Sequence, residues 1–225
     1  MVAIFFSFYH NRDLVPHLND NLVEQIQFVF LYLFNKSLND GPKGALSDIA
    51  DITMGQSPSG NSYNDRGEGV PFFQGSTDFG AIYPTVHTYT TNPARFASIF
   101  DTLLSVRAPV GSINTAFENC CIGRGLASIR GKNNNNTFVR YLLKNSLWYF
   151  DKLNRGGTTF GSITKNYLFD MPIIIPNEHD VELFEQKAST LEHQIFVNEL
   201  QNRRLLSLRN FILPMLINGQ ATFSS

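Results

Sequence analysis

The sequence predicts an α+β fold, with one mixed α/β domain flanked by a short N-terminal helix and a long C-terminal helix that resembles a coiled coil. Two observations lead to this prediction. Apolar residues recur at helical spacing over residues 15–34 and 180–218, whereas the segment between them is rich in glycine, threonine and aromatic residues. We therefore expect an N-terminal helical region at residues 1–43, the mixed domain at 44–176 and the long helix at 177–225.

The N-terminal helix is expected at residues 15–34. Pro16 suits the first turn of a helix, where no backbone N–H is required. The apolar residues that follow are spaced by three or four positions: Leu18, Leu22, Ile26, Val29 and Leu33. The sequence Asn-Asp-Gly-Pro at 39–42 then breaks the chain, so we expect the mixed domain to start near Gly44.

The mixed domain is expected to consist of short strands separated by polar loops. The apolar patterns that predict strands lie at residues 46–52, 70–73, 102–106, 113–117, 121–129 and 171–176. Asn136 or Thr137 can cap a helix that runs to about Leu153. The domain therefore contains one helix of substantial length among its strands.

The C-terminal helix carries a seam whose positions alternate in steps of four and three, as in a coiled coil. These positions are Phe184, Ala188, Leu191, Ile195, Asn198, Asn202, Leu205, Arg209, Ile212 and Leu216. Asn198 and Asn202 place amides in the middle of the seam, where polar residues fix register and partner choice. Pro214 is expected to end or kink the helix.

The charge of the chain is near neutral overall but uneven along the sequence. The 225 residues carry a net charge of −1, yet residues 119–169 contain eight basic side chains and one acidic, a local charge of +7. Such a segment can form a surface that faces phosphates, or it can be an ordinary solvated face. No apolar stretch reaches the roughly 18 residues that span a bilayer, so we expect a cytoplasmic protein without a membrane partner.

Few residues suit catalysis. The five histidines do not show metal-ligand spacing, and the sequence contains no P-loop, dinucleotide fingerprint or nucleophile elbow. Cys120 and Cys121 are adjacent, and we interpret both as reduced core residues. We therefore expect no metal and no catalytic residue, and keep as an alternative a hydrolase or nuclease that uses Asp101, Glu118 or Cys121.

Three polar loops suit a binding function better. They lie at residues 56–61, 74–77 and 155–162, and they combine Gln, Asn, Ser, Thr and Arg with glycine. These side chains read base edges by hydrogen bonding, and glycines let the backbone approach phosphates. Each loop alone is also compatible with an ordinary surface loop.

Several segments in a fixed order resemble the DNA-specificity (S) subunit of type I restriction–modification enzymes. The matching segments are residues 46–58, 70–75, 101–111, 121–127 and 160–165, followed by 171–176. Residues 18–22 are similar to part of a helix that precedes a recognition domain in this family. The resemblance covers the chain from about residue 15 onward, and it depends on the order of the segments rather than on any single motif.

The resemblance implies a fold and a set of partners. S subunits have two target-recognition domains, each reading half of a split DNA site, separated by two long antiparallel helices. This chain has one such domain, so it looks like half of an S subunit, and two copies would form a homodimer that reads an interrupted palindrome. The implied partners are double-stranded DNA, methyltransferase (modification) subunits that bind S-adenosylmethionine, and a restriction or translocase subunit. We expect S-adenosylmethionine, ATP and magnesium on these partners, and no cofactor in this non-catalytic chain.

The candidate residues follow from these expectations. The residues expected to bind DNA are Gln56, Ser57, Ser59, Asn61, Gln74, Thr77, Arg107, Arg155, Thr158, Thr159, Ser162 and Lys165. The residues expected at the dimer or partner contact are Leu22, Ile26, Phe184, Leu191, Ile195, Asn198, Asn202, Leu205 and Ile212. A stand-alone DNA-binding regulator that needs no methyltransferase is a second alternative.

Overall fold

The structure is a computed structural model that describes residues 2–35, 41–155, 162–218 and 220, with side chains described at 17–35, 41–151, 162–218 and 220. The chain forms two compact units. The first, called here the helical unit, comprises residues 1–29 and 186–225. The second, called here the body, comprises residues 30–185. The α+β class predicted from the sequence is confirmed.

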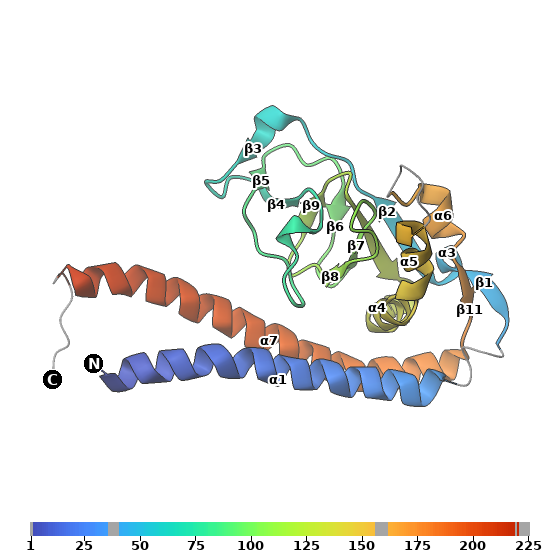
Figure 1. The fold of residues 1–225 in the computed structure, drawn as a ribbon, viewed down its shortest axis with the longest axis horizontal. Coiled ribbons are helices and arrows are strands. Elements are labelled where there is room, and N and C mark those ends of the chain that lie inside the picture. Colours follow the sequence, from blue (N-terminus) through green and yellow to red (C-terminus); the bar gives the residue numbers. More distant parts are fainter. Residues whose placement is uncertain (1, 36–40, 156–161, 219, 221–225) are drawn as a thin grey trace. The chain divides into compact units, whose positions relative to one another are not determined.

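The secondary structure follows the expected order of a helix, a set of strands and a long helix (Figure 1). The helices are α1 (Val2–Phe34), α3 (Leu46–Ile49), η1 (Gly60–Ser62), η2 (Ser76–Asp78), η3 (Lys132–Asn134), α4 (Asn136–Asn145), α5 (Leu147–Arg155), α6 (Lys165–Phe169) and α7 (Glu178–Ile217). The strands are β1 (Lys43–Ala45), β2 (Ala50–Met54), β3 (Tyr63–Asn64), β4 (Val70–Phe73), β5 (Tyr89–Thr90), β6 (Phe96–Ala97), β7 (Thr102–Ser105), β8 (Ile113–Thr115), β9 (Cys120–Ile122), β10 (Leu126–Gly131) and β11 (Pro172–Ile174). No helix among the described residues is long and apolar enough to cross a membrane.

Short strands build three sheets in the body. A four-stranded antiparallel sheet has the order β2-β10-β7-β8, and a five-stranded sheet has the order β3-β5-β4-β9-β6. In the second sheet β4 and β9 are parallel, which places the ends of both strands at the same edge. β1 and β11 pair as a separate antiparallel ribbon, so the two ends of the body's strand region meet.

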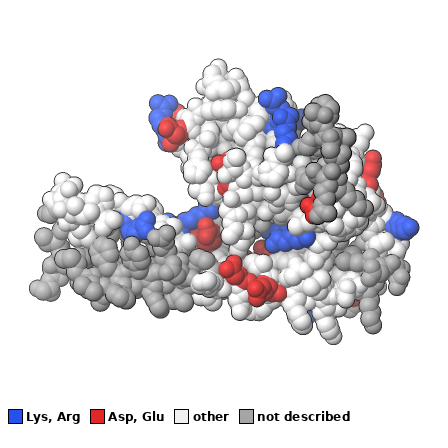
Figure 2. Space-filling view, in the orientation of Figure 1, with Lys and Arg blue, Asp and Glu red and all other residues white. Residues whose placement is uncertain are grey.

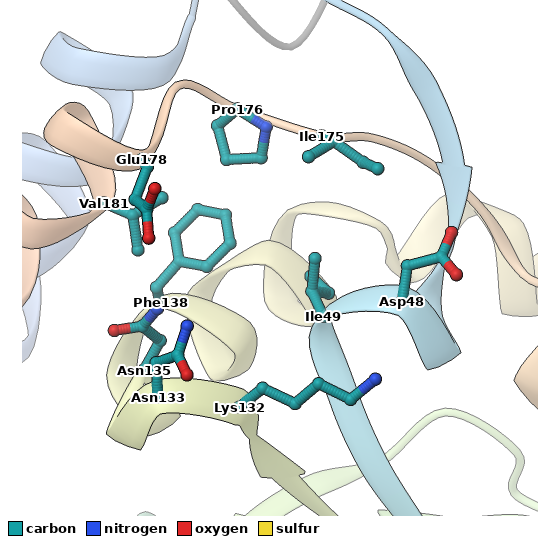
Figure 3. A pocket seen from close by; sticks show the side chains of 10 residues that line it. All are labelled: Asp48, Ile49, Lys132, Asn133, Asn135, Phe138, Ile175, Pro176, Glu178 and Val181. Carbon is teal, nitrogen blue, oxygen red and sulfur yellow. The ribbon is translucent and has the colours of Figure 1, made fainter.

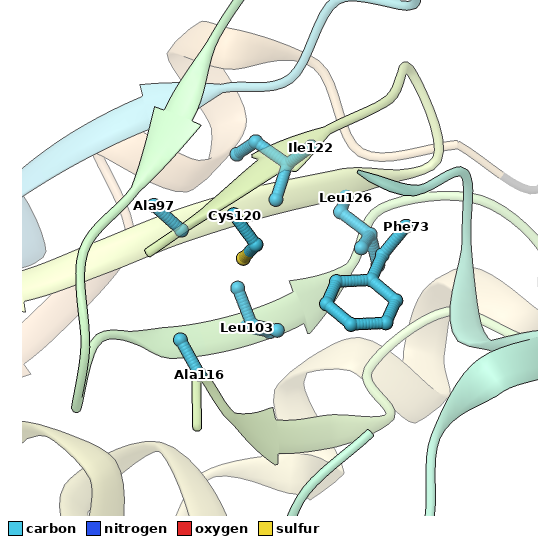
Figure 4. Close-up of a cluster of buried hydrophobic side chains, with 7 residues drawn as sticks. All are labelled: Phe73, Ala97, Leu103, Ala116, Cys120, Ile122 and Leu126. Atoms are coloured by element: carbon cyan, nitrogen blue, oxygen red, sulfur yellow. The ribbon is translucent and has the colours of Figure 1, made fainter. Parts of the chain in front are cut away.

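A tightly packed apolar cluster lies where the larger sheets meet. Its residues come from strands that are far apart in the sequence (Figure 4). They are Phe73, Ala97, Leu103, Ala116, Cys120, Ile122 and Leu126, all of them buried. The alternation of small and large side chains fills this space without polar groups. Both cysteines are free thiols within the core, as the sequence predicted.

A second cluster of the body is aromatic. Phe30, Phe34, Phe138, Tyr141 and Phe184 are buried, with ring centroids between 5.0 and 6.4 Å apart. Most of these rings meet at tilted or edge-on angles, which suits their quadrupoles. The cluster fastens α4 to the last residues of α1 and the first turns of α7, within the body.

The helical unit is an antiparallel pair formed by α1 and α7 (Figure 1). Ile26 and Ile195 are fully buried. Further along the same two helices, the Asn198 amide donates to the Asn19 side-chain oxygen at 2.9 Å. Asn19 is only 4% exposed and Asn198 is half-buried, so this polar pair is partly buried, and Glu192 is a further buried polar residue of this unit.

The structure corrects several local predictions. α1 begins at Val2, so Pro16 lies inside the helix rather than in its first turn. Residues 46–49 form a helical turn because the Asp48 carboxylate accepts the Ala45 N–H at 2.8 Å. Pro214 does not end α7, which continues to Ile217.

Two further corrections concern elements that the sequence joined. The helix predicted from Asn136 to Leu153 is broken at Ser146, whose hydroxyl donates to the Leu142 carbonyl and so turns toward the end of α4. The strand predicted at residues 121–129 is interrupted by a turn at 123–125. This turn has consequences for the binding site.

Candidate nucleic-acid interface

Four strands of the body end at one place. β2, β4, β7 and β9 reach it with their carboxyl ends, and the turn 123–125 joins β9 to β10 there (Figure 1). The Gly123 N–H donates to the Phe73 carbonyl at 2.8 Å, at the end of β4. The Gly125 carbonyl accepts the Val106 N–H at 2.9 Å, just after β7. The turn is therefore held by backbone hydrogen bonds from two neighbouring segments.

The loop after β2 packs directly on the same turn. The Gly55 N–H donates to the Leu126 carbonyl at 2.9 Å, and the Gln56 N–H donates to the Ile122 carbonyl at 3.0 Å. A Cβ atom at position 55 would lie 2.1 Å from the Gly123 carbonyl oxygen. Because that neighbour is backbone, only glycine permits so close an approach.

Polar side chains connect these loops on their exposed side. The Ser57 hydroxyl donates to the Gln74 side-chain oxygen at 3.0 Å, and Ser57 accepts the Arg124 backbone N–H at 3.3 Å. Arg107 forms a β-bridge with Ser162, and both are exposed. We name this surface the polar edge, and it consists of Gln56, Ser57, Gln74, Arg107, Arg124 and Ser162. Five of these six residues were predicted from the sequence, and the fold brings the six together from five segments.

The other predicted DNA-binding residues are placed differently. Ser59 and Asn61 are exposed next to or within η1, and Thr77 is exposed within η2. Lys165 begins α6 and is exposed, with its ammonium 5.0 Å from the centre of the Phe169 ring. The side chain of Arg155 and all of Thr158 and Thr159 lie outside the described residues. The side-chain bonds that join the loops of the polar edge run through Ser57 rather than through these residues.

Three basic side chains of the segment 119–169, among those that the structure describes, are bonded within the body. Arg140 is only 3% exposed and donates to the Thr115 hydroxyl. Arg130 pairs with the buried Asp101 carboxylate at 2.7 Å. The Lys132 ammonium donates to the Ser47 carbonyl. Figure 2 shows basic and acidic side chains in small separate groups on one face, without a continuous basic patch.

The comparisons with known proteins fit this geometry. Residues 42–205 match the sequence family described as the type I restriction modification DNA specificity domain. The chain belongs to this family. The match includes the whole polar edge, every strand of the body from β1 onward and the first part of α7.

Two curated relatives are specificity subunits. A protein from Methanocaldococcus jannaschii, described as the MjaX type I restriction enzyme specificity subunit, is 37% identical over 171 residues, which is 75% of this chain and 40% of that protein. The HindI specificity subunit of Haemophilus influenzae is 24% identical over 186 residues, 78% of this chain and 40% of that protein. The chain therefore spans about 40% of the length of each relative.

Solved structures show the same fold. The HsdS subunit from Thermoanaerobacter tengcongensis is 29% identical with a TM-score of 0.56, and the match covers 95% of this chain and 55% of that one. A chain from a study of complex assembly and conformational transition in a type I restriction–modification system is 30% identical with a TM-score of 0.54, covering 95% and 57% of the two chains. The S subunit from M. genitalium, at 12% identity and a TM-score of 0.57, matches in fold alone over 91% and 58%.

Asp101, Cys120 and Cys121 of this specificity domain lie in its core. The Asp101 carboxylate accepts the Ser98 N–H at 2.8 Å and the Ser128 hydroxyl at 2.7 Å, in addition to its ion pair. Cys121 is fully buried, and burial together with the nearby Asp101 charge raises the pKa of the Cys120 thiol to about 12. Within the described part of the chain, no three His, Cys, Asp or Glu side chains gather as a metal site would require. These contacts place Asp101 and Cys121 in structural roles within the core, whereas Glu118, the third residue of the hydrolase or nuclease alternative, is exposed.

A cavity of about 310 Å³ lies in the body away from the polar edge residues (Figure 3). Phe138, Ile175 and Val181 form its apolar wall. Two of its polar groups are bonded within the chain, because Lys132 donates to Ser47 and the Asp48 carboxylate accepts the Ala45 N–H. The cavity shares no lining residue with the polar edge, and we assign no ligand to it.

The predicted partner-contact residues divide by exposure. Ile26 and Ile195 are buried and Asn198 is bonded to Asn19, so the middle of the seam is used inside the chain. Phe184 is likewise buried, in the aromatic cluster of the body. Leu22, Leu191, Asn202 and Ile212 are half-buried and Leu205 is exposed. Beyond residue 202 the exposed apolar side chains of α7 are Leu205, Leu208, Phe211 and Ile217.

Proposed function

We propose that this chain recognises a specific DNA sequence and thereby directs a type I restriction–modification assembly to its site. The polar edge is the observation that carries the proposal. Donors and acceptors from five segments lie there on a backbone that glycines and hydrogen bonds hold in place. Side chains fixed in this way can read base edges with little loss of conformational entropy on binding.

The chain acts by binding rather than by chemistry. Of the three residues of the catalytic alternative, Asp101 and Cys121 are buried in the core and Glu118 is exposed. Methylation and cleavage would be performed by modification and restriction subunits, which would bring S-adenosylmethionine, ATP and magnesium. The specificity domain would select the DNA sequence on which these subunits act. The helices would provide the surface on which the subunits assemble.

Selection from random DNA tests this function, because it assumes no target sequence. The purified chain, alone and with modification subunits, is incubated with a library of random duplex DNA, and the bound fraction is sequenced. We expect a split motif to be enriched, more strongly when the modification subunits are present because a near-neutral chain neutralises few phosphates by itself. Bound DNA without an enriched sequence would contradict the proposal. Tight, selective binding that is unchanged by the subunits would favour a stand-alone regulator.

We further propose that two copies of the chain pair to present two recognition domains. The seam at Ile195 and Asn198 is used within the chain, so a contact between copies would use the apolar side chains that remain exposed on α7. Phe211 is 68% exposed, and Leu205 and Leu208 lie on the same stretch of helix. A two-fold dimer of identical recognition domains would read an interrupted palindrome.

The mass of the chain in solution tests the dimer directly. Light scattering should give about twice 25.4 kDa for the unaltered chain and 25.4 kDa for a variant with Leu208→Asp and Phe211→Asp. Because both side chains are exposed, these changes leave the described packing within the chain intact. Trp148→Asp is a matched control, since it removes an exposed aromatic side chain from the body and should leave the dimer intact. A monomeric unaltered chain would refute the dimer while leaving DNA recognition untouched.

A further inference from the structure

We propose that Arg124 is a specificity-determining residue that contacts a guanine in the DNA target, and that Ser57 and Gln74 position it. This inference rests on the proposed function, and it assigns a base contact to a residue that the sequence indicated only as one of the eight basic side chains of residues 119–169. Arg124 lies inside the segment 121–129, which the sequence predicted to be a single strand. The structure instead places it at the tip of the turn between β9 and β10.

The backbone on both sides of Arg124 is fixed. The Gly123 N–H donates to the Phe73 carbonyl at 2.8 Å, and the Gly125 N–H donates to the Gln74 carbonyl at 3.1 Å. The turn is closed by a bond of 3.0 Å from the Leu126 N–H to the Gly123 carbonyl. A guanidinium carried on this turn starts from a defined position, which reduces the entropy lost when it binds.

The two glycines leave Arg124 as the one side chain of the turn. A Cβ atom at position 123 would lie 2.8 Å from the Gln74 side-chain oxygen, and one at position 125 would lie 2.5 Å from the Gln74 carbonyl oxygen. Larger residues at either position would push the loop after β4 away. The Gly-Arg-Gly sequence therefore combines a close approach of two loops with one long cationic side chain directed at solvent.

A short chain of hydrogen bonds links Arg124 to its two neighbours. The Arg124 backbone N–H donates to the Ser57 hydroxyl oxygen at 3.3 Å, and that hydroxyl donates to the Gln74 side-chain oxygen at 3.0 Å. Ser57 thus satisfies one amide of the turn and orients Gln74. The Gln74 amide nitrogen keeps donors for acceptors on a base, so two adjacent side chains can contact neighbouring positions of the target.

Arg124 differs in its pairing from three other arginines of the body, and it shares an exposed position with Arg95 and Arg107. Arg130 is held by Asp101, Arg140 is buried against Thr115, and Arg66 pairs with Glu68 at 3.3 Å. Arg124 is exposed, and among the described residues no carboxylate pairs with it. An arginine that is free of carboxylates can donate two parallel hydrogen bonds to O6 and N7 of guanine, the base for which this geometry is most specific.

The experiment compares enriched motifs. The full-length chain with modification subunits is given the random duplex library, and the same selection is repeated with Arg124→Ala, Arg124→Lys, Ser57→Ala and Ser57→Thr. Arg66→Ala is the matched control, because it removes an exposed arginine and the same charge from the loop between β3 and β4. Thermal unfolding of each variant shows that it is folded.

We expect Arg124→Ala to lose the preference for guanine at one position by about tenfold to a hundredfold while the rest of the motif is kept. Arg124→Lys should recover part of it, because lysine donates to guanine without the planar fork. Ser57→Ala should weaken the preference for guanine at the same position, and Ser57→Thr should keep that preference. A serine with a purely structural role would not change the preference at one position of the motif. Arg66→Ala should leave the motif unchanged.

Two results would overturn the inference. An unchanged motif in Arg124→Ala would mean that Arg124 does not contact a base. A uniform loss of affinity with an unchanged motif and a smaller salt dependence would make Arg124 a phosphate contact. Failure of the proposed function is distinguishable from both, since the unaltered chain would then enrich no motif at all, and the inference would fall with it.

Discussion

The polar edge and the helical unit both contain hydrogen bonds between uncharged polar side chains, but burial gives these bonds opposite roles. In the helical unit the amides of Asn198 and Asn19 meet in an apolar contact, where Asn19 is 4% exposed. At the polar edge the hydroxyl of Ser57 meets the amide of Gln74 near solvent. A buried pair must be complete, since an unpaired partner costs the full desolvation penalty. An exposed pair costs little to break, so its members remain able to exchange partners with a ligand.

The two regions also obtain their rigidity from different parts of the chain. The helical unit depends on side chains that meet along two helices, as in a coiled coil. The polar edge depends on backbone packed directly against backbone across Gly55, Gly123 and Gly125. A specificity domain needs this second arrangement, because it allows exposed side chains to differ while the supporting loops stay in place. The following variants test whether the two kinds of rigidity are distinct.

The largest effect is expected at Gly55. A methyl group there would meet the Gly123 carbonyl oxygen at 2.1 Å, and neither segment can move without breaking backbone hydrogen bonds. We expect Gly55→Ala to lower the free energy of unfolding by about 3 kcal/mol, at the upper end of overpacking costs. Urea unfolding followed by circular dichroism measures this change.

Gly75→Ala is the control for this variant. Gly75 lies in the neighbouring loop with an extended φ of −168°, and a Cβ atom there would have no neighbour within 4 Å. Its free energy of unfolding should change by no more than about 0.5 kcal/mol. Equal changes in the two variants would show that backbone packing does not hold the polar edge.

A somewhat smaller effect is expected at Asp101, which supports the strands behind the polar edge. Its carboxylate is 6% exposed and pairs with Arg130 while accepting the Ser98 N–H and the Ser128 hydroxyl. We expect Asp101→Ala to lower the free energy of unfolding by about 2 to 3 kcal/mol, because three donors lose their acceptor. This loss of unfolding free energy is at the low end for buried ion pairs, because Arg130 is partly exposed.

Glu68→Ala removes a carboxylate from a comparable pair that is open to solvent. Glu68 is 55% exposed and bonds Arg66, so its loss should cost at most about 0.5 kcal/mol. Both variants should still enrich the same DNA motif when folded. A folded Asp101→Ala chain that has lost only an activity would revive the catalytic alternative that the buried position argues against.

The sequence predicted several strands of the body, but not β1, β3, β5 or β6, and it predicted most of the polar edge, because these features follow from local patterns. Alternating or continuous apolar runs predicted β4, β7, β8 and β11. Segments rich in polar residues and glycine predicted the loops at Gln56 and Gln74. The convergence of these loops could not be predicted. It depends on pairings between strands that are distant in the sequence, such as the parallel pair of β4 and β9.

Arg124 and the basic segment show where local patterns mislead. The apolar residues around Arg124 suit a strand, and only the two flanking glycines indicated a close approach of another backbone. The charge of residues 119–169 suggested a phosphate-facing surface, but Arg130 and Arg140 are used inside the body. Whether a charge faces solvent or a buried partner depends on tertiary structure, which charge counting cannot supply.

The smallest of the three effects is expected in the helical unit. Asn198→Ala would leave the Asn19 amide buried without its partner, which should cost about 1 to 2 kcal/mol of unfolding free energy. Gln25→Ala is the matched control, since the Gln25 amide bonds Asn21 on the exposed surface of the same helix and should contribute only a few tenths of a kcal/mol. Thermal unfolding by circular dichroism compares the two variants.

The double variant Asn19→Leu with Asn198→Leu separates stability from register. Removing both amides leaves no unpaired group, so the stability should return to or exceed that of the unaltered chain. The apolar contact would then lack the pair that distinguishes one alignment of the helices from the next, as a buried asparagine does in coiled coils. Spin labels on cysteines placed at the exposed positions Gln25 and Gln194 would report the alignment as a distance between the two helices. A single sharp distance distribution in both the unaltered chain and the double variant would mean that the body, and not the amide pair, sets the register of the helices.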